Sequence, residues 1–320
     1  MSVLHLLQEV AQNVQNGQAA GPPPGGPPGG EDSFSFRDAL FELIQFVGWF
    51  LSVGAVGFRF GVVRRVRGMT DDARRILAAD NAAMLGVLGI ILLFVSYLGG
   101  PLLESMSSHQ SFAAALPKNR GPFELRMALL AIALVGFLLA RASATLGWTV
   151  ALLGVVIASL FPLYTGRGAG KVNAVHVLAA STWLGTLLVL TIVGVRGVLK
   201  REASGAPRSV LVADLVNSFS PLALTAAAIV GLTGLTTAWM HLHRISSLWT
   251  TGYGITLIVK LIFVLIVVSL GAWNWRRVRP SLGDVGTEEM IRRSSMMELT
   301  FGAIVLICTA VLVTLPSPRP

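Results

Sequence analysis

Residues Lys171 to Leu190 have the sequence KVNAVHVLAASTWLGTLLVL. It predicts an apolar helix with one imidazole, His176, about a turn and a half inside its first end. Trp183 follows seven residues later, so both side chains project from the same face of the predicted helix. A histidine placed there has to be solvated by something other than lipid. We therefore interpret the rest of the chain as the scaffold that supplies partners to His176.

The composition is that of an integral membrane protein. Of the 320 residues, 53% are hydrophobic and 13% are charged, and the mean hydropathy is +0.70. The apolar runs are continuous, whereas a membrane β-barrel would alternate apolar and polar residues. No clustered basic face predicts nucleic-acid binding, and no nucleotide-binding glycine loop predicts ATP-driven transport. No pairing of a nucleophile with a base emerges, so the sequence does not predict an enzyme.

The hydropathy pattern predicts an all-α integral membrane protein, a bundle of about eight transmembrane helices. The predicted spans are Phe36–Val63, Asp80–Gly100, Phe123–Ala140, Thr145–Tyr164, Val172–Val195, Ala213–His241, Tyr253–Trp275 and Met296–Leu315. Glycines at packing spacing indicate that helices approach each other closely. These glycines are Gly54, Gly57 and Gly61 in the first span and Gly231 and Gly234 in the sixth.

The connecting loops predict the orientation. The loops after spans one, three, five and seven carry twice as many Lys and Arg residues as the opposite side. By the positive-inside rule these loops are cytoplasmic, which predicts an N-out/C-out topology. Residues 1–35 form a predicted extracytoplasmic tail in which Gly21–Gly30 contains only glycine and proline, as is typical of a flexible tether. The start lacks the basic end and apolar core of a signal peptide.

Soft donors gather on the predicted outer face. Met240, His241 and His243 lie at the outer end of the sixth span, and His176 lies near the outer end of the fifth. Imidazole and thioether are the preferred ligands of copper, above all Cu(I). The other interpretation is structural: interfacial histidines wetted by headgroups, and a His176 satisfied by a neighbouring hydroxyl or carbonyl. Glu104, Met106 and His109 are expected in the outer loop between spans two and three.

Charged groups inside the spans are functional candidates by default, because each is costly there. Lys260 is either a fixed positive charge or a side chain that extends to the outer interface, and Asn274 lies on nearly the same face. Glu298 is either part of a transport pathway or a helix-end carboxylate solvated near Arg292 and Arg293. Asp80 and Asp214 are likewise expected near cytoplasmic helix ends. These acids and His176 are the polar residues that the bundle has to accommodate.

Several of these residues occur in an ordered pattern that resembles the copper resistance protein D (CopD) family. The segment His176-Val-Leu-Ala-Ala-Ser-Thr-Trp183-Leu-Gly185 is similar to the H-L-x-A-x-x-x-W-x-G signature of that family. The resemblance continues through Phe219-Ser220, Gly231-Leu-Thr-Gly234, Val259-Lys260-Leu261, Asn274, Arg276-Arg277, Arg292-Arg293 and Glu298. It is strongest over residues 171–316. We therefore expect a 1–35 tail, a four-helix region at 36–164 and a CopD-like four-helix domain at 171–316.

The resemblance implies a bacterial inner-membrane protein that moves copper from the periplasm toward the cytoplasm beside a soluble periplasmic copper carrier. It implies roles for His176, Lys260 and Glu298, whereas His241 and His243 rest on their placement alone. Two other hypotheses stay open. One is a b-type haem or quinone-linked subunit with His176 and His241 as axial ligands. The other is a non-transporting subunit that holds a membrane-complex partner through the N-terminal tail.

Overall fold

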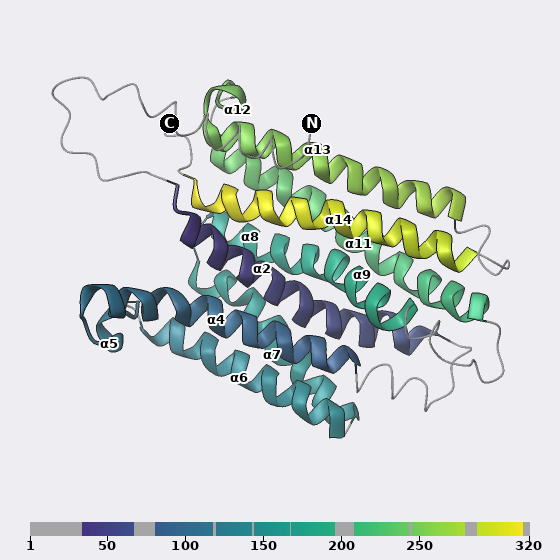
Figure 1. The fold of residues 1–320 in the computed structure, drawn as a ribbon, viewed down its shortest axis with the longest axis horizontal. Helices are drawn as coiled ribbons and strands as arrows, with labels where there is room; N and C mark the ends of the chain where they lie inside the picture. Colours follow the sequence, from purple (N-terminus) through teal and green to yellow (C-terminus); the bar gives the residue numbers. More distant parts are fainter. Residues whose placement is uncertain are drawn as a thin grey trace.

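A computed structural model describes residues 34–66, 81–117, 120–142, 144–166, 168–195, 208–242, 245–278 and 287–315. All of the elements in these ranges are helical, and Figure 1 shows them as a bundle of antiparallel helices. The elements are α2 Phe36–Gly57, η1 Phe58–Val62, η2 Val63–Arg65, α4 Ala83–Ser108, α5 Phe112–Ala115, α6 Arg120–Ala142, α7 Ala144–Thr165, α8 Ala169–Ala180, η4 Ser181–Gly185, α9 Thr186–Val189, η5 Leu190–Val195, α11 Arg208–Leu242, α12 Ser247–Thr250, α13 Gly252–Trp273, η6 Asn274–Val278 and α14 Thr287–Thr314.

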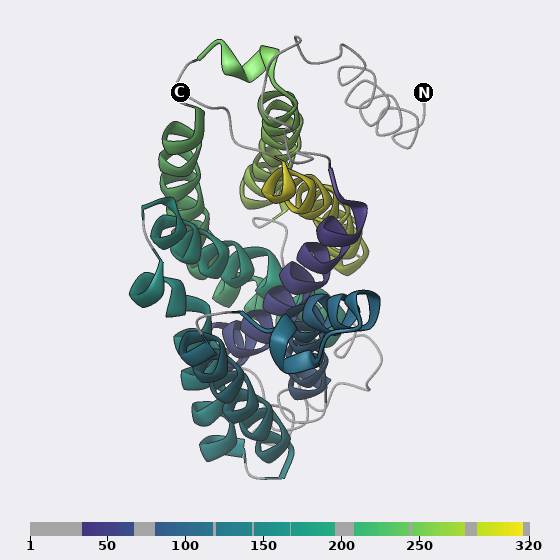
Figure 2. The same ribbon diagram turned by 90° about the vertical axis from the view of Figure 1, so that its left-hand side faces the viewer.

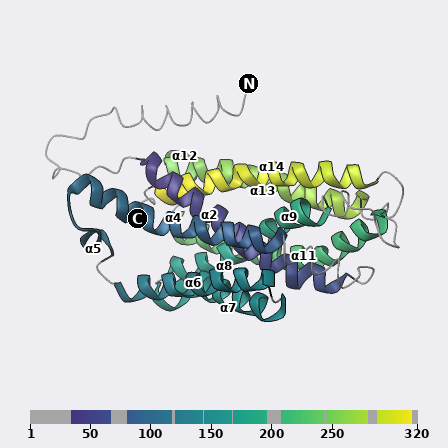
Figure 3. The ribbon, with the colours of Figure 1, turned by 60° about the horizontal axis from the view of Figure 1, so that its bottom comes forward.

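Eight of the described helices are long and apolar enough to cross a membrane, which confirms the predicted all-α membrane fold. The fifth span is a continuous run of α8, η4, α9 and η5, in which η4 and η5 are π-helical turns. Short helices α5 and α12 lie at the end of the bundle where α2 begins (Figure 3). The tail at 1–33, the start predicted at Asp80, and His243 lie outside the described residues.

The largest differences from the predicted helix boundaries are at the end of α4 and the start of α14. The second span was expected to end at Gly100, but α4 continues through Pro101 to Ser108. Glu104 and Met106 therefore lie in the last turns of a helix and not in a loop, and His109 caps that helix with a left-handed backbone, φ 52°. The eighth span was expected from Met296, but α14 begins at Thr287, so Glu298 lies about three turns inside the helix. Hydropathy detects the apolar part of a helix and misses its polar extension.

The first and fifth spans occupy the centre of the bundle. Among the described spans these two are the most buried: 61% and 67% of the residues in their most apolar segments lie inside the structure. The outer helices instead present wide apolar faces to lipid. Figure 1 shows α4, α6 and α7 on one side of α2 and α13 and α14 on the other, and Figure 2 shows α2 near the middle of the bundle. One continuous core joins the two regions that we predicted as 36–164 and 171–316.

Glycines permit the closest helix contacts. A methyl group added at Gly54 would overlap the carbonyl oxygen of Gly185, and one added at Gly57 would overlap the Thr186 hydroxyl. The central helices therefore meet backbone against backbone. Gly231 differs from the other predicted packing glycines, because a methyl group there would have no neighbour within 4 Å. The glycine spacing alone did not separate packed positions from lipid-facing ones.

An arginine joins three helices of the N-terminal region. The Arg126 guanidinium of α6 lies 5.3 Å from the ring centre of Tyr97 on α4 and 5.5 Å from that of Phe161 on α7. Its Nη1 donates a hydrogen bond of 3.3 Å to the Tyr97 hydroxyl. A cation between two aromatic faces is stabilised by their negative potential, which offsets part of the cost of a charge at membrane depth.

We expect Gly54→Ala to destabilise the bundle, because the added methyl group has to push α2 away from the fifth span. Overpacking of this kind costs about 1–3 kcal/mol. The Tm of the detergent-purified protein should fall for Gly54→Ala and stay unchanged for the matched control Gly231→Ala. Equal Tm values for the two variants would contradict the central role of this contact.

Candidate functional site

The His176 imidazole lies between α8 and α11. Its Nδ1 is 3.0 Å from the Thr233 hydroxyl oxygen, and a methyl group at Gly234 would lie 3.1 Å from its Cε1. The Thr233 hydroxyl itself donates to the carbonyl of Ile229 at 2.6 Å. A hydroxyl has one proton, so its oxygen accepts from Nδ1–H of His176. This network assigns the proton of His176 to Nδ1, and the backbone carbonyl of Val230 also bonds the ring.

His241 has the same arrangement at the end of α11. Its Nδ1 is 2.8 Å from the carbonyl oxygen of Thr237, which can only accept a hydrogen bond, so Nδ1 carries the proton and Nε2 keeps its lone pair. The ring stacks on Tyr253 with the ring centres 6.0 Å apart and the planes at 16°. Met240 lies beside it, with its methyl carbon 3.8 Å from the Cβ position of Gly168. A hydrogen-bonded and stacked imidazole is typical of a metal ligand with a fixed tautomer.

Lys260 and Cys308 join His176 from two further helices. Lys260 on α13 is half-buried, and its charge acts on both the imidazole of His176 and the thiol of Cys308 on α14. Cys308 is 4% exposed. Lys260 was predicted as a candidate from its charge, whereas Cys308 and Thr233 were not predicted. Their proximity depends on the crossing of α8, α11, α13 and α14, for which a single sequence contains no signal.

The histidines occupy two levels of α11. His176 contacts Thr233, and His241, eight residues further along α11, bonds the carbonyl of Thr237. The two imidazoles therefore bond different acceptors of the same helix. Among the described residues, no group of three or more His, Cys, Asp and Glu side chains surrounds a common centre. The donors therefore form two separate levels.

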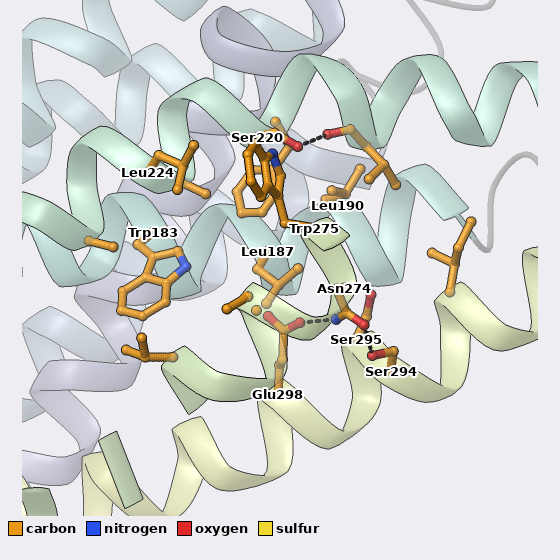
Figure 4. A pocket seen from close by; sticks show the side chains of 18 of the residues that line it. Trp183, Leu187, Leu190, Ser220, Leu224, Asn274, Trp275, Ser294, Ser295 and Glu298 are labelled. Atoms are coloured by element: carbon orange, nitrogen blue, oxygen red, sulfur yellow. Dashed lines mark hydrogen bonds between the residues drawn. The ribbon is translucent and has the colours of Figure 1, made fainter. Parts of the chain in front are cut away.

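A cavity of about 300 Å³ follows on the other side of Trp183 (Figure 4). The fifth span, α11, the end of α13 and α14 all contribute to its walls. Trp183 lines this cavity, and so do Asn274 and Glu298, three of the residues selected from the sequence. His176 lies seven residues from Trp183 on the same span, about 10 Å along the axis. The indole therefore stands between His176 and the cavity.

The polar end of the cavity is a hydrogen-bonded row of three side chains. The Asn274 amide donates to Oε1 of Glu298, and the Ser294 hydroxyl donates to Oδ1 of Asn274 (Figure 4). Glu298 is 6% exposed and Ser294 is 7% exposed. Ser294 was not selected from the sequence, although it lies four residues before Glu298 and so shares its helix face. The four-residue spacing from Glu298 was the feature of the sequence that could have identified Ser294.

The remaining sequence candidates lie away from this cavity. Glu104 and Met106 are exposed on the last turns of α4, and His109 is exposed at its end. Asp214 lines a separate open hollow with Arg65, Asn217 and Ser218. Neither group joins the row of donors along α11.

A comparison with known proteins finds a family model described as "Copper resistance protein D" (CopD), which matches residues 213–312. Lys260, Asn274 and Glu298 lie inside the match, and His176 lies before it. The "Copper transport protein CutJ" of Bacillus subtilis (strain 168) is 32% identical over 143 residues, which is 45% of this chain and 24% of that relative. The chain thus covers about a quarter of the relative's length. No solved structure matches.

The family match confirms the resemblance that the sequence suggested, and the eight apolar helices agree with it. Residues 213–312 of this multi-pass membrane protein are thus similar to the copper resistance protein D (CopD) family.

Proposed function

We propose that the protein transports copper across the membrane, from the extracytoplasmic side toward the cytoplasm, and is a transporter, not an enzyme. The observation that carries this proposal is the order of groups along α11. Met240 and His241 lie at its end, Thr233 holds His176 two turns deeper, and the cavity with Glu298 begins at Ala227. The family match and the name of the partial relative support copper as the cargo.

The donor chemistry favours Cu(I). The outer levels present Nε2 of His241 and His176 and the thioether of Met240, which are soft or intermediate ligands. Two- or three-coordinate binding by such groups requires no cluster of carboxylates. Lys260 opposes a second positive charge next to His176, so it limits how long a copper ion stays there. His243 would add another soft donor at the outer level, although it lies outside the described residues.

The proposed direction follows from the contrast between the two ends of the pathway. The outer donors are nitrogen and sulfur, whereas the polar groups of the cavity are the oxygens of Glu298, Asn274 and Ser294. Oxygen ligands bind Cu(I) weakly, so the ion is captured outside and released inside. Arg276 lines the cavity, and the loop that follows it is one of those that the positive-inside rule assigns to the cytoplasm.

The orientation also suggests the partners. In a bacterial inner membrane the level of Met240 and His241 faces the periplasm, where a soluble copper carrier would deliver the ion. The tail of residues 1–35 is predicted on the same side and would contact such a carrier or a membrane-complex partner. Copurification of a partner by the full chain, and its loss on deletion of the tail, would support this part of the proposal.

We expect His176→Ala and Lys260→Ala to impair copper uptake into proteoliposomes that contain the purified protein. His176→Ala removes the ligand between the outer level and the cavity, and Lys260→Ala removes the charge that promotes its release. The measurement is the initial rate of Cu(I) entry under reducing conditions, with His109→Ala as the matched exposed-histidine control. Wild-type rates in both variants would remove the proposed pathway.

Thr233→Val should weaken copper binding without removing a ligand. The valine cannot accept a hydrogen bond from Nδ1–H of His176, so the ring loses its fixed orientation. Loss of such an orienting group typically lowers metal affinity about 10- to 100-fold. Competition with a Cu(I) chelator measures the change. Thr236→Val is the control, because Thr236 is exposed and bonds only its own helix, at Leu232; equal affinities for the two variants would contradict the role of Thr233.

The haem alternative makes a different prediction. Axial ligation of one iron requires two imidazoles on opposite sides of it, whereas His176 and His241 bond Thr233 and Thr237 of the same helix. We expect the purified protein to lack a Soret band in its visible spectrum. A Soret band that disappears in both His176→Ala and His241→Ala would overturn copper transport in favour of a b-type subunit.

A further inference from the structure

The cavity contains one acidic side chain, Glu298, and its carboxyl group has no ion-pair partner among the described residues. Its Oε1 accepts from Asn274, and its Oε2 points toward Gly271, where a methyl group would lie 4.0 Å away. An unpaired carboxylate at membrane depth is costly, and such groups commonly mark proton relays. The cavity of about 300 Å³ has room for several water molecules beside it.

The charged groups around Glu298 leave this carboxyl group without a fixed neutralising partner. Arg276 is the other charged residue that lines the cavity, and its side chain is exposed at the rim. Arg292 and Arg293 lie about a turn or more before Glu298 on α14, and Arg59 lies at the same end of the first span. The cavity residues of the fifth span and of α11 are apolar except for Ser220. Among the described side chains none forms an ion pair with Glu298, so a proton or the cargo ion can neutralise it in place.

We propose that Glu298 exchanges a proton for the copper ion in the inner cavity. This inference rests on the proposed function and names how release is controlled. In the copper-free cavity the carboxyl group holds a proton. When Cu(I) enters, the O–H bond breaks, the proton leaves through the cavity toward the cytoplasmic side, and the carboxylate balances the charge of the ion. When Cu(I) leaves, a proton from the same side returns to Glu298.

The exchange explains why a hard carboxylate lies at the end of a pathway of soft donors. A carboxylate attracts Cu(I) by charge but is a poor ligand for it, so the ion is neutralised without being trapped. The Asn274–Ser294 row keeps Oε1 in position in both states. Because the proton returns to the side it left, each cycle moves copper and no net proton. Copper release should therefore depend on the cytoplasmic pH and not on the outer pH.

Infrared difference spectroscopy of the purified full chain tests this proposal with Cu(I) as the probe. The carboxylic acid band that Glu298→Gln removes should be present without copper and should disappear when Cu(I) saturates the protein. Glu298→Asp should keep a copper-sensitive band, which guards against a misfolded glutamine variant. Glu42→Gln is the matched control, because Glu42 is a half-buried carboxyl group of the first span outside the cavity; the band that it removes should not respond to copper.

The outcomes separate the two proposals. If metal analysis finds no copper bound to the wild-type chain, the proposed function fails, whatever the state of Glu298. If copper binds and the Glu298 acid band is unchanged, or is absent before copper is added, the proton exchange is wrong and copper transport is unaffected. Loss of the band with bound copper, in the wild type and in Glu298→Asp, supports the exchange.

Discussion

Where α2 crosses the fifth span, no side chain separates the two backbones, because Gly54 of one meets Gly185 of the other. The contact determines more than the distance between the helices. It fixes the rotation of the fifth span about its own axis, and with it the direction of every other side chain on that span. Trp183 lies two residues from Gly185 and lines the cavity, and His176 lies two turns further and contacts α11. The positions of the polar groups thus depend on a contact between two residues without side chains.

Polar groups are costly in lipid, which explains why both His176 and His241 are hydrogen-bonded within the bundle. Helix α11 satisfies both imidazoles through its threonines: Thr233 offers a hydroxyl to His176, and Thr237 offers a carbonyl to His241. In both cases Nδ1 bonds a threonine of α11. The proposal that the two histidines are ligands depends on Nε2 being available at both positions.

Much of the fold could be predicted from the sequence, because runs of apolar residues long enough to cross a bilayer have few other structures available to them. The eight spans and the family resemblance were both confirmed. Helix ends were less predictable: the second span was expected to end at Gly100, yet α4 continues to Ser108. The site was predictable only as a set of residue types. That Glu298 and Asn274 bond each other, while His176 and His241 lie apart, depends on how α11, α13 and α14 cross.

Trp183 raises the question of how an ion would pass from the outer donors to the cavity. It is 9% exposed and stands between His176 and the cavity, which Ala223 and Ala227 line from α11. A bare cation in an apolar barrier of about 10 Å is far more costly than one held by ligands or a carboxylate. On the proposed pathway the indole of Trp183 therefore has to move for copper to pass. Trp183 itself belongs to the π-helical turn at Ser181–Gly185. Such turns are often found at functional sites, and here one coincides with the point where the outer and inner halves of the pathway are separated.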